Sequence, residues 1–354
     1  YFIGTGRWFE DGNVFEPSVL LSRVQAGFVL GTTVVLGAVA LREGLVFPRV
    51  HRVEVALSRW PRERDGFRIV QISDIHIGAL RGKRFASDLV ARINALEPDF
   101  VLHGGDFLCG GSSFDLPTDV FEESIRDTRG YYDQIQSPFY AVPGNHDCDG
   151  QTWSFDSFHA VYDTDFILRL DDIGETLRVG RANVFLGDTK THGTGQWMDE
   201  HDLLLREANS SAKAAGKSII LCLHTWVLPD TQTEPGSHGQ GCVVDAKRLL
   251  DTISACESVV LVLTGHRHLN RISAYRDFLI ADTSCLIGYP FGFREITLTD
   301  DGWFKSRFHR LSVPDAMDAY RNRDNAGEDA HWEGQPHDQD SDILIPRLHR
   351  SQPR

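Results

Sequence analysis

The sequence predicts an α/β fold for most of the chain. Between residues 52 and 311, short apolar runs typical of buried strands alternate with stretches whose apolar residues recur at helical spacing. The last apolar runs follow one another without a helix pattern between them, which predicts hairpins at the end of this region. The chain is 41% hydrophobic and 24% charged, which is ordinary for a globular protein and excludes a largely disordered or multi-span membrane protein.

The predicted elements follow one another in a regular order. A strand at 67–73 (FRIVQIS) precedes a helix at 83–96, where Leu89, Ile93 and Leu96 lie on one face. The further parallel units comprise strands at 100–103, 139–142, 218–223 and 259–263 and helices at 119–135, 199–215 and 245–255. The closing strands are expected at 278–281, 293–299 and 303–308, the last two joined by an Asp-Gly turn at 301–302.

Two terminal segments differ from this pattern. Residues 24–41 (VQAGFVLGTTVVLGAVAL) form an uncharged apolar run of 18 residues, at the short end of the length that spans a bilayer. We interpret this run as a membrane helix, with a buried or interfacial helix as the alternative, and the arginines that follow it favour a cytoplasmic catalytic domain. The chain then divides into an N-terminal segment (1–50), an α/β domain (51–312) and a polar, acidic tail (313–354) that is expected to be disordered.

Residues that can bind metal ions follow five of the predicted strands. The motifs are Asp74-Ile75-His76, Gly104-Gly105-Asp106, Gly144-Asn145-His146-Asp147, His224 and Gly265-His266-Arg267-His268. One such motif carries little weight, because a polar residue after a strand is more often a cap. Five of them indicate a shared site, because ligands of open α/β sheets bind at the carboxyl ends of the strands. Imidazole and carboxylate ligands suit manganese, iron or zinc, and a pair of such ions can hold both oxygens of an in-line displacement at phosphorus.

The order of these motifs resembles the five-block signature of the calcineurin-like metallophosphoesterases. The resemblance extends from Asp74 to His268 and implies a four-layer α/β/β/α sandwich of two mixed sheets. It also implies a dinuclear centre whose bound hydroxide attacks phosphorus. One ion would be held by Asp74, His76 and His268, the other by Asn145, His224 and His266, and Asp106 would bridge them. His146 would serve as a general acid or phosphate contact, oriented by Asp147.

The sequence also departs from the family pattern. Cys109 stands where many relatives carry a second acidic residue, and Arg267, Leu269 and Asn270 replace residues that are common after the last block. The ligand positions are not affected, but contacts on the substrate side cannot be transferred from relatives. The apolar segment before the domain is similar to a membrane-anchored bacterial-type subgroup.

The sequence therefore predicts a hydrolase of phosphomonoesters or phosphodiesters at a membrane. A formal net charge of −14 repels phosphate backbones, so the expected substrate is a small or lipid-linked phosphate ester and no long nucleic acid is expected as a partner. A cyclic-nucleotide phosphodiesterase is an alternative, because the same metal core serves that reaction. A non-catalytic scaffold of the same fold is less favoured, because every ligand position carries a competent donor.

Overall fold

In the computed structural model, the described residues are 8–10, 13–15, 26–29, 31–33, 69–77, 83–110, 116–186, 195–228, 242–244, 246–286, 290, 292–299, 303–310 and 332–345. The chain forms two compact units. The first contains residues 1–46 and 313–320, and the second contains residues 47–312 and 321–354.

The smaller unit contains a two-stranded antiparallel sheet of β1 (Trp8–Glu10) and β2 (Asn13–Phe15). Within the apolar run 24–41, residues 26–29 and 31–33 are helical and exposed, and Phe28 exposes 74% of its surface. The rest of the predicted membrane helix lies outside the described residues. In the part of the chain that the structure describes, no helix combines the length and apolarity needed to cross a membrane.

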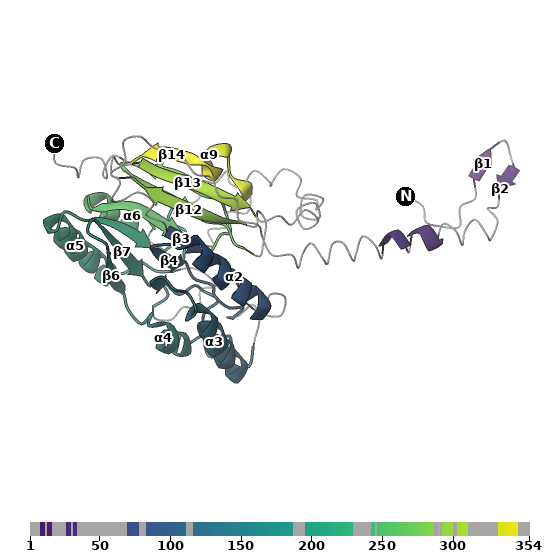
Figure 1. Cartoon of the computed structure of the whole chain (residues 1–354), viewed down its shortest axis with the longest axis horizontal. Coiled ribbons are helices and arrows are strands. Elements are labelled where there is room, and N and C mark those ends of the chain that lie inside the picture. The colour runs from purple at the N-terminus through teal and green to yellow at the C-terminus, as the bar shows by residue number, and fades with distance from the viewer. Residues whose placement is uncertain are drawn as a thin grey trace. The chain divides into compact units, whose positions relative to one another are not determined.

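The larger unit contains two six-stranded mixed sheets (Figure 1). The first has the order β14-β13-β12-β3-β4-β5. Its strands are β3 (Ile69–Ile72), β4 (Phe100–His103), β5 (Phe139–Ala141), β12 (Gly292–Leu298), β13 (Trp303–Arg310) and β14 (Ser341–Leu344). The strands β3, β4 and β5 run parallel. The strands β12 and β13 form the predicted antiparallel hairpin, and β14, which was not predicted, pairs antiparallel with β13.

The second sheet has the order β10-β11-β9-β8-β7-β6. Its strands are β6 (Leu168–Ile173), β7 (Leu177–Ala182), β8 (Ser218–Cys222), β9 (Val259–Thr264), β10 (Arg271–Tyr275) and β11 (Phe278–Asp282). The four central strands are parallel, and the two edge strands pair antiparallel with them. Central strands such as β8 and β9 are buried along their whole length, which explains their continuous apolar sequences.

The two sheets pack face to face and bury an apolar layer between them. Phe100 and Leu102 of β4 lie in this layer with Leu261 of β9. The next residue, His103, contacts Tyr132 on the opposite face, because successive strand side chains point to opposite faces. The helices are α2 (Lys83–Leu96), α3 (Thr118–Tyr132), α4 (Asp156–Tyr162), α5 (Asp199–Ala214) and α6 (Ala246–Ala255). They flank the paired sheets (Figure 1), and this architecture confirms the predicted four-layer fold.

The acidic tail contains an ordered segment where disorder was expected. Residues 332–345 form a short helix, α9 (Pro336–Gln339), followed by β14, which adds an antiparallel strand to β13. Ile345 is fully buried against the layer between the sheets, and Ile343 packs beside it. The expectation of disorder is therefore wrong for residues 332–345, because two isoleucines and one strand pairing attach this stretch to the domain. The remainder of the tail lies outside the described residues.

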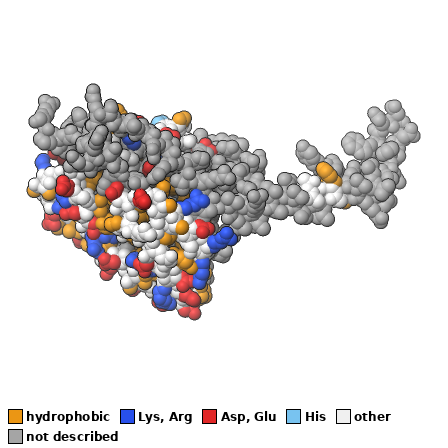
Figure 2. All heavy atoms as spheres, in the orientation of Figure 1, with side chains coloured by type: hydrophobic (Ala, Val, Ile, Leu, Met, Phe, Trp, Pro, Cys, Tyr) orange, Lys and Arg blue, Asp and Glu red, His pale blue; other side chains and the backbone are white. Residues whose placement is uncertain are grey.

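Charged side chains of both signs lie among hydrophobic and other side chains on the described part of the face shown in Figure 2. Acidic and basic groups are interspersed over the described part of that face rather than gathered by sign. Several ion pairs of the protein join residues four apart in the sequence, about one helical turn, as in Arg129 with Asp133 and Lys247 with Asp251.

Candidate metal centre

The loops that follow the central strands of both sheets meet at one site. Backbone hydrogen bonds join these loops directly: the N–H of Asp74 donates to Gly105 O at 3.0 Å, and the N–H of Gly265 donates to His224 O at 2.9 Å. The first bond joins the loops after β3 and β4, and the second joins the loops after β8 and β9. The parallel order of these strands therefore brings side chains distant in the sequence to one edge.

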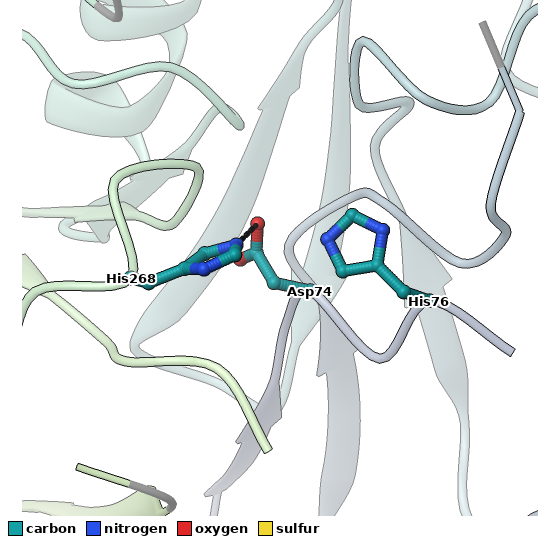
Figure 3. A group of neighbouring side chains, drawn as sticks. All are labelled: Asp74, His76 and His268. Atoms are coloured by element: carbon teal, nitrogen blue, oxygen red, sulfur yellow. Dashed lines mark ion pairs between the residues drawn. The ribbon is translucent and has the colours of Figure 1, made fainter. Parts of the chain in front are cut away.

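One group of possible ligands consists of Asp74, His76 and His268, whose donor atoms lie within 4.8 Å of one another. Figure 3 shows the carboxylate of Asp74 between the two rings, with the His268 ring directed at it. The distance from His268 Nε2 to Asp74 Oδ1 is 3.2 Å, and the two ring centroids are 5.6 Å apart. Asp74 is fully buried, so its charge needs a positive partner inside the protein.

A second group consists of Asp106, His224 and His266. The Nε2 atom of His224 lies 3.2 Å from Asp106 Oδ2 and 3.2 Å from Asn145 Oδ1. Asp106 also lies 3.7 Å from His76 Nε2, which belongs to the first group. The structure therefore brings the seven predicted ligands into one neighbourhood, with Asp106 in contact with both groups.

Three of the histidines are oriented in the same way. His76, His146 and His224 each place Nδ1 against a backbone carbonyl, at 3.2, 2.8 and 2.6 Å from the oxygens of Leu108, Gly110 and Gly104. Because a carbonyl can only accept, each Nδ1 carries the hydrogen and donates it. In the neutral form of each ring, the Nε2 atom is then unprotonated and able to bind a cation, which is the usual arrangement around histidine ligands.

The backbone at the site adopts a conformation that is rare away from glycine. Nine described residues other than glycine have a positive φ angle, and five of them are predicted ligands. These five are Asp74 (51°), His76 (46°), Asp106 (55°), His266 (70°) and His268 (56°). Strained backbone of this kind persists only where surrounding contacts hold it, and it concentrates at functional sites.

Gly144 and Asp147 shape the loop that carries Asp106. A Cβ atom on Gly144 would collide with the carboxylate and the backbone nitrogen of Asp106. The Asp147 carboxylate accepts hydrogen bonds from the backbone N–H groups of Asp106 at 2.9 Å, Phe107 at 2.8 Å and Gly144 at 2.8 Å. These contacts differ from the expected role of Asp147, which was to orient the His146 ring. Gly110 provides the hydrogen bond to that ring instead.

His146 lies at the border of the two groups. Its backbone N–H donates to Asp106 Oδ1 at 2.8 Å, and its ring centroid lies 5.0 Å from that of His76. Its ring nitrogen can also form a ligand set with His76 and Asp106. This geometry fits a phosphate contact, as the sequence predicts, and it also fits a metal ligand.

The electrostatics of the site favour a bound cation. Burial lowers the pKa of His224, but Asp106 and Asp74 outweigh that effect and raise it to about 9 in the metal-free protein. Burial, followed by the nearby charge of His224, lowers the pKa of His266 to about 3 and keeps that ring neutral. Among the described residues, the buried Nδ1 of His266 has no hydrogen-bond partner. A metal ion would balance the charge of the buried carboxylates and bind the unsatisfied imidazole nitrogen.

Two supporting residues were not predicted as part of the site. His103 is buried in β4, accepts a hydrogen bond from the N–H of Gly105 at 3.2 Å and stacks on Phe107. Cys285 follows β11 and forms a side-chain hydrogen bond with His268. A single cysteine after a hairpin strand carries no sequence signal, and a histidine inside a strand pattern, such as His103, is more often a packed residue than part of a site.

Comparison with known proteins identifies the family. The family model for calcineurin-like phosphoesterases matches residues 67–270, which is more than half of the chain. The chain belongs to this family. An uncharacterized metallophosphoesterase of Helicobacter pylori is 25% identical over 234 residues, which cover 65% of this chain and 51% of the relative. The chain thus spans about half the length of this phosphoesterase relative.

Other relatives match over shorter stretches. A transmembrane protein with metallophosphoesterase domain from Bos taurus is 34% identical over 116 residues, which cover 32% of this chain and 24% of that protein. Among solved structures, a dimetal phosphatase from Danio rerio superposes with a TM-score of 0.56 at 12% identity. The superposition covers 79% of this chain and 99% of that phosphatase, and it supports the phosphoesterase fold.

Proposed function

We propose that this phosphoesterase chain hydrolyses phosphomonoesters or phosphodiesters with the help of two metal ions. The observation that carries the proposal is the convergence of buried carboxylates and correctly oriented imidazoles on one centre. Asp106 lies 3.2 Å from His224 and 3.7 Å from His76, so a single carboxylate reaches both ligand groups.

The residues divide into two ligand sets around Asp106. Asp74, His76 and His268 would hold one ion, and Asn145, His224 and His266 would hold the other. When bound, two ions of manganese, iron or zinc act as Lewis acids on the phosphate and make a nucleophile available at neutral pH. The carbonyls of Leu108 and Gly104 keep His76 and His224 in the tautomer that such binding requires.

His146 would act on the leaving group. Gly110 O accepts the Nδ1 hydrogen and fixes the ring, which leaves Nε2 to exchange a proton with a leaving oxygen. The 2.8 Å bond from its backbone N–H to Asp106 couples the position of this ring to the bridging carboxylate.

We further propose that the substrate is a lipid-linked phosphate ester and that the catalytic domain faces the cytoplasm from a membrane. Two observations support this proposal. The apolar run 24–41 is long enough to associate with a bilayer. A relative from Chlamydia muridarum named UDP-2,3-diacylglucosamine pyrophosphatase is 30% identical over 84 residues, which cover 23% of each chain.

Turnover of a bis-aryl phosphate after chelation and metal add-back tests the enzyme activity. We expect the chelated protein to be inactive and to recover on addition of Mn²⁺, Fe²⁺ or Zn²⁺, while Asp106→Asn stays inactive with each metal. Chelated protein that retains full turnover would contradict a metal-dependent reaction.

Substrate class and membrane attachment need separate measurements. A panel containing a lipid phosphate, a nucleotide diphosphate-lipid, cyclic AMP and a bis-aryl phosphate would compare the candidate substrates. We expect the highest kcat/KM on a lipid-linked ester.

Removal of residues 1–48 should move the protein from the membrane fraction to the soluble fraction without loss of bis-aryl phosphate turnover. Equal membrane binding by the shortened protein would contradict the anchor.

A further inference from the structure

The loop that carries His266 and His268 is attached to the C-terminal segment through Asn270. Asn270 is fully buried, although asparagine is usually exposed. Its backbone N–H donates to Trp332 O at 3.1 Å, and its Nδ2 donates to Glu333 O at 3.2 Å. Its Oδ1 accepts a hydrogen bond from Arg294 Nη2. Each of these bonds joins residues distant in the sequence.

Arg294 extends this attachment into the first sheet. The residue belongs to β12 and is fully buried. Its Nη1 donates to Ser306 Oγ at 2.6 Å and to Asp338 O at 2.9 Å, and its Nη2 donates to Asp282 O at 3.1 Å. A buried guanidinium is tolerated only where hydrogen bonds replace its water, so this network resists rearrangement.

The C-terminal segment also contacts the start of β10, directly after this loop. The carboxylate of Asp338 accepts from the N–H of Ile272 at 2.7 Å, and its other oxygen accepts from the N–H of Gln335 at 2.7 Å. Gly334 has a φ angle of 72°, and a Cβ atom at this position would collide with Asn270 O. Only glycine allows the segment to approach the loop so closely.

We propose that residues 332–338 are a positioning element of the metal centre and that Asn270 is the positioning residue through which they act. His266 and His268 are held at φ angles of 70° and 56°, and such backbone needs support from its surroundings. The network around Asn270 provides that support two residues beyond His268. This inference rests on the proposed function, because it assigns the segment a role in binding the same ions.

Metal binding by the full-length chain tests the inference without an activity measurement. Mn²⁺ titration of chelated protein, followed by calorimetry, compares Gly334→Ala with wild type. The matched control is Gly216→Ala, because Gly216 has a similar φ angle of 66° but open space around it. We expect Gly334→Ala to bind at least one of its two Mn²⁺ ions about tenfold more weakly, within the range seen when groups behind metal ligands are removed. The control should bind like wild type.

A second pair of variants removes side-chain hydrogen bonds instead of adding a clash. Asn270→Ala should weaken Mn²⁺ binding in the same way. Its control is Asn94→Ala. Like Asn270, Asn94 donates through Nδ2 to a backbone carbonyl, here that of Gln134, and its Oδ1 accepts one hydrogen bond, here from the backbone N–H of Gln136. These bonds join α2 to the chain that follows α3. Losses of less than threefold relative to the controls in both test variants would overturn the inference. Wild type that binds none of Mn²⁺, Fe²⁺ and Zn²⁺ would instead overturn the proposed function.

Hydrogen exchange provides a readout that does not depend on any variant. Coupling between two sites is reciprocal, so Mn²⁺ at the centre should slow exchange in the segment if the segment supports the centre. We expect the amides of residues 332–345 in wild type to exchange at least threefold more slowly with Mn²⁺ than with chelator. If Gly334→Ala fails to fold, an unchanged exchange rate in wild type would still overturn the inference.

Discussion

The carboxylate of Asp147 holds the backbone N–H of Asp106, with 2.9 Å between the nitrogen and Oδ2. Its other oxygen accepts the N–H of Phe107 at 2.8 Å. The side chain of Asp106 faces the ligand groups, 3.2 Å from His224. The two buried acids therefore have different contacts: Asp147 fixes the shape of the loop, and Asp106 faces the candidate metal ligands.

The first prediction separates these two roles with isosteric substitutions. Asp147→Asn replaces an acceptor oxygen by an NH₂ group that must face backbone N–H groups, and each unsatisfied buried donor costs about 1–3 kcal/mol. We expect the metal-free Asp147→Asn protein to unfold at clearly lower urea concentration than wild type. Asp106→Asn should lose Mn²⁺ binding, because the carboxylate charge is gone. Its metal-free stability should fall less than that of Asp147→Asn, because the amide oxygen can still accept from the N–H of His146, although the ion pair with His224 is lost.

Urea unfolding and Mn²⁺ titration of both variants check this division. Asp149→Asn is a suitable control, because Asp149 accepts local backbone hydrogen bonds from Gln151 and Thr152 in the neighbouring turn. If Asp147→Asn were as stable as the control while turnover alone fell, Asp147 would act in proton transfer rather than in holding the loop.

The second prediction concerns His146, whose geometry fits two roles. As a general acid, it should tolerate alanine substitution with both metal ions retained and turnover reduced roughly 10²–10⁴-fold. The reduction should be larger for an alkyl ester than for a nitrophenyl ester, because an alkoxide needs a proton more than a nitrophenolate does. Asn145→Ala provides the comparison, since it should directly weaken the binding of one of the two ions.

Metal analysis together with turnover of the two esters distinguishes the roles of His146. Equal proportional losses on both esters would count against proton donation. A single bound ion in His146→Ala would mean that the ring is a ligand, in the set that it can form with His76 and Asp106.

Much of the fold could be predicted because its central strands are buried on both faces. Strands β8 and β9 appear in the sequence as continuous apolar runs, and their observed bounds agree with the predicted ones. The pair β6 and β7 was not predicted. Each face of this pair carries an ion pair, Arg178 with Asp172 on one and the buried Arg181 with Asp171 on the other, so the charges interrupt the apolar pattern. Strand β14 was missed because it pairs with β13 across a long stretch of acidic sequence.

The candidate ligands could be predicted because each follows a recognisable strand, and the strand order brings them together. Their supports could not, because they depend on contacts between distant residues. Asn270 bonds to a carbonyl 63 residues away, and nothing near it in the sequence indicates this partner. The role of Asp147 was predicted from its neighbour His146. Its carboxylate instead accepts hydrogen bonds from backbone N–H groups 39 to 41 residues earlier in the chain and from that of Gly144.

The third prediction tests the close approach of Gly144 to Asp106. In Gly144→Ala the methyl group would displace the Asp106 carboxylate, so we expect loss of Mn²⁺ binding and of turnover. Gly180→Ala is the control, because a Cβ there meets its neighbours at ordinary distances of 3.4 to 3.9 Å. Mn²⁺ titration of the two proteins checks the prediction, and near-normal binding by Gly144→Ala would show that the loop can relax.

The last prediction concerns Asp282, a buried acid behind the metal centre. Its Oδ1 accepts a hydrogen bond from Thr264 at 3.2 Å, and its Oδ2 has no hydrogen-bond partner among the described residues. Burial, followed by the charge of Asp74, raises its pKa from 3.8 to about 8, although Arg267 and Arg271 act in the opposite direction. Arg294 lies nearby: burial lowers the pKa of its guanidinium to about 10, and Asp338 and then Asp282 act in the opposite direction.

The direction of the pH effect follows from these values. Between about pH 4 and 8 the folded protein keeps a proton on Asp282, whereas the unfolded chain has lost it. Folding stability should therefore fall as pH rises through this window, by at most about 1.4 kcal/mol per pH unit, and level off above it. Asp282→Asn cannot ionise and should lack this component.

Urea unfolding of both proteins in chelator at pH 5, 6, 7 and 8 measures the difference in their free energies of unfolding. The histidines contribute equally to both proteins if their titration is independent of residue 282, so their contributions cancel in this difference. We expect wild type to lose stability relative to Asp282→Asn at each step. Parallel stability curves would mean that Asp282 is ionised in the folded protein, with its charge balanced by the three nearby arginines.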